Sequence, residues 1–206
     1  MANVITNIKV NDEIIMMSNL NTSHFLKTIC LGGVDIAMEN YQKDLMIWFA
    51  QHDWNIRGLG CEGFDICEII WDKHIFDEQK KFILKVIDST INKVNWNLLH
   101  YAPPEEWLYG KLSDFQIMIN NFNEEHIAPD EEEELFAFDD KVRLYEKCDK
   151  HKVYKHWHGC IICDNQIEED TAPNSRSAAS ERKEPLAKLA GRAIGRLIGW
   201  FTRNTH

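Results

Sequence analysis

The chain has 206 residues, of which 44% are hydrophobic, and its formal net charge is −10. That length is enough for one hydrophobic core and a small additional module, and no apolar run reaches the roughly 18 residues of a membrane-spanning helix. The first residues lack the basic start and apolar stretch of a secretory signal peptide, so we expect a cytoplasmic protein with reduced thiols.

The charge is unevenly distributed along the chain. Residues 1–147 carry 13 Lys and Arg against 26 Asp and Glu, whereas residues 176–206 carry 7 against 2. An acidic body favours a basic protein partner and opposes the approach of nucleic-acid phosphates. A basic tail on an acidic body is therefore the first organising feature of the sequence.

The first third of the chain predicts helices after a short extended segment. Residues 5–17 are compatible with a strand or a hairpin. Ser23 is a plausible N-cap for a short helix through Cys30, and two glycines follow it. A second helix is predicted over residues 34–53, because apolar residues recur there at helical spacing.

Two further amphipathic helices are predicted downstream. Asp77 is a plausible N-cap for a helix that ends near Val94, and Pro104 suits the first turn of the next helix. Glu105 and Glu106 then place negative charge at the helix N-terminus, where it is favourable. These patterns predict a mainly α fold class, with a compact acidic helical domain over residues 1–145.

Five consecutive carboxylates follow the helical region. Such a run repels itself and resists burial, so the simplest interpretation is a solvated loop. The alternative is an acidic strip that docks a basic partner, with apolar anchors directly after it. Its residues are Asp130, Glu131, Glu132, Glu133 and Glu134.

Two pairs of metal-ligating residues follow the acidic run. Cys148 and His151 are separated by two residues, as are Cys160 and Cys163. This spacing is typical of a tetrahedral zinc site, in which each pair forms a tight turn around one ion. Because all four ligands come from the protein, we expect a structural Zn²⁺, since a catalytic zinc keeps one position open for water.

The segment resembles a zinc ribbon, and the resemblance covers only the sixteen residues 148–163. It implies a small structural module, which we assign to residues 146–165. Gly159, directly before the second pair, can adopt backbone conformations that other residues avoid. His156 or His158 could replace His151 as the fourth ligand.

The last part of the chain predicts a linker and a tethered helix. Residues 166–184 are rich in Ser, Ala and charged residues and lack the apolar side chains that a folded segment needs. Residues 185–203 form a basic amphipathic pattern, which suits docking onto a partner or an anionic membrane surface. The residues expected to make that contact are Leu186, Lys188, Leu189, Arg192, Ile194, Arg196, Leu197, Trp200 and Phe201.

No common catalytic motif is present in the sequence. Asp65, Glu68 and Asp72 would share one face of a helix, with His74 close by. That arrangement is either an exposed acidic face or an acid–base or metal site, and we favour the exposed face. The sequence therefore favours a non-enzymatic protein, and an enzyme with an unrecognised site stays as a further alternative.

The leading functional hypothesis is a non-enzymatic protein-binding module, such as an adaptor, an inhibitor or an immunity-type protein. One alternative is a membrane-surface protein or effector that the basic tail anchors, peripheral to the membrane on the cytoplasmic side. A second alternative is a nucleic-acid-binding zinc ribbon, which ranks last because the acidic body repels phosphates.

Overall fold

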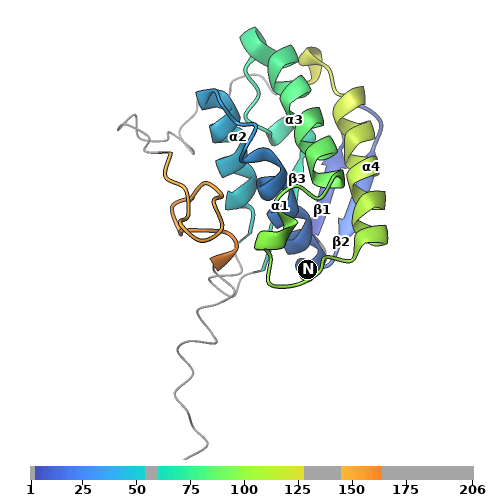
Figure 1. Ribbon diagram of the computed structural model, residues 1–206. Coiled ribbons are helices and arrows are strands. Elements are labelled where there is room, and N and C mark those ends of the chain that lie inside the picture. The colour runs from blue at the N-terminus through green and yellow to red at the C-terminus, as the bar shows by residue number, and fades with distance from the viewer. Residues whose placement is uncertain (1–2, 54–59, 128–144, 164–206) are drawn as a thin grey trace, which may run out of the picture. The chain divides into compact units, whose positions relative to one another are not determined.

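A computed structural model of the chain describes residues 3–53, 60–127 and 145–163 (Figure 1). Four α-helices and a small three-stranded sheet make up most of this part of the chain. The predicted helical class is thus confirmed in its coarse form, with a sheet added. The acidic strip 130–134, the linker and the basic tail lie outside the described residues.

The sheet begins with a hairpin, as the sequence allowed. β1 (Asn3–Asn7) pairs antiparallel with β2 (Glu13–Met17), and β3 (Phe64–Asp65) joins β1 in parallel, so the strand order is β2-β1-β3. One face buries Ile5 and Ile15, which are register partners, and β2 contacts α1 and α4. β2 forms an edge of the described sheet.

Helix α1 (Asn19–Gly33) begins four residues before the predicted N-cap. Ser18 is the N-cap, and its hydroxyl accepts a hydrogen bond from the backbone N–H of Asn21 at 3.3 Å. The prediction of Ser23 as N-cap was wrong. Ser23 lies inside the helix, and its buried hydroxyl donates to Asp53 at 2.7 Å.

The same helix also continues through the two glycines that were expected to close it. A Cβ at Gly32 would collide with Thr90 of α3, and a Cβ at Gly33 would collide with Met46 of α2. The glycines therefore allow α1 to approach its neighbours closely, and this packing outweighs their low helix propensity.

Helix α2 (Asn40–Gln51) begins later than predicted. The Gln42 side-chain oxygen accepts hydrogen bonds from the backbone N–H groups of Met38 and Glu39, at 2.7 and 3.0 Å, and so fixes the helix start. Residues 34–39 consequently form a loop instead of the first turns of the helix.

The two later helices match the sequence patterns more closely. α3 (Phe76–Ile91) carries Asp77 in its first turn instead of at the N-cap, and it ends before Val94. α4 (Glu105–Asn121) starts directly after Pro104, which is its N-cap instead of a residue of its first turn, and Glu105 and Glu106 lie in that turn as predicted.

The three carboxylates that a single helix would have aligned are not on one helix. Asp65 ends β3 and caps the 3₁₀ turn η2 (Ile66–Glu68), where the Glu68 side chain accepts from its backbone N–H. Asp72 caps a separate 3₁₀ turn, η3 (Lys73–Ile75). These side chains serve local capping, so the exposed acidic face predicted for a helix does not form.

The core centres on aromatic rings from different elements. Phe115 of α4 makes edge-on contacts with Phe25 of α1, Phe49 of α2 and Phe64 of β3, with ring centroids 5.4, 6.2 and 6.3 Å away. Such contacts add to the free energy gained from burying the rings themselves. These rings belong to a hydrophobic core that the helices and strands share with apolar side chains of residues 145–163.

Candidate metal centre

Among the described residues, four metal-binding side chains converge at Cys148, His151, Cys160 and Cys163, with all their donor atoms within 4.8 Å of one another. His151 Nδ1 lies 3.8 Å from Cys148 Sγ, 3.5 Å from Cys160 Sγ and 3.2 Å from Cys163 Sγ. The Sγ atoms of Cys148 and Cys163 are 3.7 Å apart. A Zn–S bond of about 2.3 Å gives a tetrahedron with edges of about 3.8 Å, and these four distances are close to that length.

A tight turn builds the first ligand pair. The backbone N–H of Cys148 donates to the Val153 carbonyl, and that of Lys152 donates to the Cys148 carbonyl, both at 2.8 Å. Lys152 takes a positive φ of 59° to close this turn. The His151 N–H then points at Cys148 Sγ at 3.5 Å, which favours the thiolate form of a metal ligand.

A second turn precedes the other pair. His156 and Gly159 exchange two backbone hydrogen bonds, of 2.9 and 2.8 Å. Gly159 has a φ of 109°, a conformation that a residue with a Cβ rarely adopts. The expected role of this glycine is thereby explained by its backbone geometry.

The site is enclosed by protein. His151 is fully buried, Cys148 and Cys160 are buried, and Cys163 is half-buried. Four protein donors therefore converge on one largely enclosed point, an arrangement that is compatible with a bound metal ion.

Burial opposes the ionisation of the three cysteine thiols at this site. Burial raises the pKa of Cys160 to about 12 and also raises the pKa of Cys163. Burial acts the same way on Cys148, but hydrogen bonds from the backbone of His151 and Lys150 and from the neighbouring thiols outweigh it and lower its pKa. A bound divalent cation reverses the penalty on the buried thiolates, because its charge stabilises them directly.

The imidazole of His151 is held in the form that binds metals. Burial lowers its pKa, and the positive charge of Lys150 lowers it further. A neutral ring offers a lone pair to the ion. The two alternative ligands, His156 and His158, are outside the converging group; burial lowers the pKa of His156 to about 4.

The segment that carries the ligands, residues 145–163, is fastened to the loop between α1 and α2; we call this segment the metal module. Lys147 Nζ donates to the Val34 carbonyl at 3.2 Å. The Tyr154 hydroxyl donates to the Ala37 carbonyl, also at 3.2 Å. The apolar side chains of the metal module join the hydrophobic core of the helices, so the metal module and the body pack as one unit.

His100, from the connection between α3 and α4, also contacts this site. His100 Nε2 lies 3.3 Å from Nε2 of His151, and the two rings stand nearly perpendicular, at 78°. His100 is 51 residues away in sequence, and no spacing motif marks it. Only the packing of the chain brings the two rings together.

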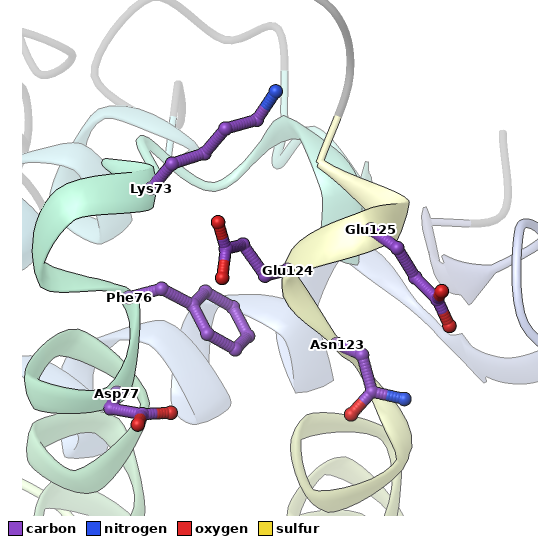
Figure 2. A pocket seen from close by; sticks show the side chains of 6 residues that line it. All are labelled: Lys73, Phe76, Asp77, Asn123, Glu124 and Glu125. Carbon is purple, nitrogen blue, oxygen red and sulfur yellow. The ribbon is translucent and has the colours of Figure 1, made fainter.

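A shallow hollow elsewhere on the body has acidic walls. It lies between the start of α3 and the 3₁₀ turn η5 (Glu124–His126). Figure 2 shows Glu124 reaching toward Phe76, while Glu125 points away from it. Its lining residues are Lys73, Phe76, Asp77, Asn123, Glu124 and Glu125. None of the four converging donors lines it.

A comparison with protein-family models finds no match, and comparisons with curated proteins and with solved structures find none either. None of the helices that the structure describes combines the length and apolar character that crossing a bilayer requires.

Proposed function

We propose that this chain is a non-enzymatic protein-binding module, of adaptor, inhibitor or immunity type, whose shape depends on one structural Zn²⁺. The observation that carries the proposal is the closed set of four donors, Cys148, His151, Cys160 and Cys163, at tetrahedral spacing in a buried site. A zinc ion held this way has no position for a reacting group, so its contribution is to folding.

Zinc would hold together a segment that is too short to fold alone. The metal module consists of two tight turns joined by isolated bridges, Lys147 with Tyr154 and His156 with Gly159. In small zinc modules the free energy of metal binding is largely the free energy of folding. Zinc binding would therefore determine whether the metal module folds and presents a defined outward surface.

That outward side has the character of a contact surface. Trp157 is 71% exposed at the tip of the turn closed by His156 and Gly159. Lys152 and Lys155 are also exposed. A rigidly held, exposed tryptophan is a frequent anchor in protein–protein interfaces.

We propose a basic protein as the partner of the acidic body, whose first 147 residues carry twice as many acidic as basic side chains. The acidic strip 130–134 and the basic tail 185–203 are further proposed contacts, and both lie outside the described residues. An anionic membrane surface is the alternative target of the tail.

Metal content tests the first part of the proposal. Protein purified without chelator should contain one zinc per chain by elemental analysis, and Cys160→Ser should lose it. Cys61→Ser is the matched control, because Cys61 contacts the Asn19 carbonyl and lies outside the converging group. A wild-type chain without metal, or a Cys160→Ser chain that retains it, would contradict the zinc site.

Partner binding tests the second part. Immobilised wild-type protein and Cys160→Ser should be compared for capture of proteins from a native cell extract, at low and high salt. We expect a basic protein that the wild type retains, that Cys160→Ser does not retain, and that salt releases. Equal retention by both forms would show that partner binding does not depend on the metal.

A further inference from the structure

We infer that His100 is the hydrogen-bond acceptor that holds His151 in its metal-binding tautomer. The connection between α3 and α4 thus contributes a positioning residue to the metal centre. This inference rests on the proposed zinc site. It assigns a positioning role to a residue that contacts a ligand and does not bind the ion itself.

The geometry of the His151 ring determines the direction of the hydrogen bond. Nδ1 is the ring atom near all three Sγ atoms, so it is the atom that meets the ion. A neutral imidazole that ligates through Nδ1 carries its proton on Nε2. That Nε2–H faces His100 Nε2 at 3.3 Å, so His151 donates and His100 accepts.

The acceptor is positioned by the body and not by the metal module. His100 follows the 3₁₀ turn η4 (Trp96–Leu98), and Trp96 and Leu99 are both buried. On the N-terminal side of this turn, the Asn95 side-chain amide donates to the Leu31 carbonyl at 3.3 Å and to Asp35 at 2.8 Å.

The other side of His100 is fixed as well. The ring of Tyr101, the next residue, packs on the ring of His24 in α1, with centroids 4.6 Å apart. His100 is therefore held between two anchored neighbours and presents its imidazole from a preset position. A ligand oriented by such a partner loses less freedom when the ion binds.

This arrangement accounts for a contact that packing alone does not require. His100 is an exposed residue, so its side chain buries little apolar area. Its Nε2 nevertheless lies beside Nε2 of His151, the ring nitrogen that would not bind the ion. Partners of this kind change metal affinity by about 10–100-fold when they are removed.

The experiment measures zinc affinity in the full-length chain by competition with a chromophoric chelator. His100→Ala should weaken zinc binding by about 10–100-fold. His100→Gln should retain most of the affinity, because its side-chain carbonyl can accept the same hydrogen bond. Asn97→Ala, an exposed substitution in the same 3₁₀ turn, should leave affinity unchanged.

Cobalt provides a spectroscopic readout of the ligand geometry. The visible bands of Co²⁺ bound to the wild type and to His100→Gln should coincide, whereas those of His100→Ala should shift as the His151 ring reorients. A role of His100 in packing alone would leave these bands unchanged.

The outcomes separate the two proposals. If the wild type binds zinc and His100→Ala binds it equally well, the role of His100 is overturned and the zinc site stands. If His100→Gln is as weak as His100→Ala, the acceptor role is overturned. If the wild type holds no zinc, the proposed function itself falls.

Discussion

The Tyr154 hydroxyl donates a hydrogen bond to the backbone carbonyl of Ala37, 117 residues earlier in the chain, at 3.2 Å. Both residues are buried. The bond joins the metal module to the loop before α2, so the stability of the metal module and that of the helical body are linked.

Tyr154→Phe should therefore lower the free energy of unfolding of the zinc-loaded protein by about 1–3 kcal/mol, because a buried carbonyl loses its partner. Denaturant titration measures the change. Lys155→Met serves as the control: its ion pair with Glu146 (3.3 Å) is exposed, and such pairs contribute about 0–1 kcal/mol. Equal effects of the two substitutions would contradict the proposed link.

Removal of the metal should open the metal module before the body. Trypsin treatment after chelation should cleave at Lys147, Lys150 and Lys152, whose side chains are exposed and whose backbone forms the tight turns that the proposed zinc would hold. Lys81 and Lys85 of α3, also exposed, provide the internal control, because their helix packs on the body core. Peptide mass mapping with and without added zinc measures the difference; identical cleavage patterns would count against a metal-held fold.

Asp65 should make the stability of the body depend on pH in the acid range. Burial opposes its ionisation, but hydrogen bonds from the Thr6 hydroxyl, from the Cys67 backbone and thiol, and from the Ile8 backbone N–H together lower its pKa. A carboxyl whose pKa is lower in the folded state stabilises the fold above its unfolded pKa of about 3.9, and this contribution disappears as the pH falls through the folded value.

Asp65→Asn should accordingly cost about 1–3 kcal/mol at neutral pH and flatten the acid limb of the stability curve. Thermal unfolding between neutral pH and strong acid measures both effects. Glu62→Gln, an exposed neighbour in sequence, is the control. If Asp65→Asn and the wild type lose stability in parallel on acidification, Asp65 does not carry the dependence.

The buried ion pair between Lys27 and Asp53 provides a further test of what stabilises the body. Lys27 and Asp53 are 1% and 3% exposed, with Nζ and Oδ2 separated by 3.8 Å, and Ser23 donates to the same carboxylate oxygen. Lys27→Met should cost about 3–5 kcal/mol, because it removes one partner of a buried pair and leaves the other charge in place. The double variant Lys27→Met/Asp53→Asn should recover part of that loss in denaturant titration; a double variant less stable than Lys27→Met would contradict the pairing.

Truncation after Arg182 should leave the thermal midpoint of the remaining chain nearly unchanged. The linker 166–184 has no Val, Leu, Met or aromatic residue with which to pack on the body. Differential scanning calorimetry of the full and truncated chains makes the comparison. A steep drop in the midpoint would assign the tail to the core.

The existence of the helices could be predicted from the sequence, but their beginnings could not. Apolar stripes predict α3 and α4 well because each helix buries one face. Ser18 and Ser23 are equally good N-caps by residue type, and only the tertiary bond from Ser23 to Asp53 decides between them. The glycines at the end of α1 were misinterpreted because their role depends on Thr90 and Met46, which are remote in sequence.

The convergence of Cys148, His151, Cys160 and Cys163 was predictable because metal chemistry restricts both residue type and spacing within sixteen residues. His100 was not predictable, since one imidazole accepting a hydrogen bond from another imposes no spacing on the chain. Local chemistry is thus visible in the sequence, whereas the contacts that orient a ligand depend on the packing of the whole body.

The position of the ligands along the chain also has a consequence for the order of folding during synthesis. All the described helices and strands end by residue 127, before the first ligand at Cys148. A ribosome adds about 5–20 residues per second, so the 21 residues between 127 and 148 give the body a lead of about 1–4 seconds over the first ligand. On the proposed zinc site, His100 would already be in place when His151 emerges, and zinc capture would follow the folding of the helices.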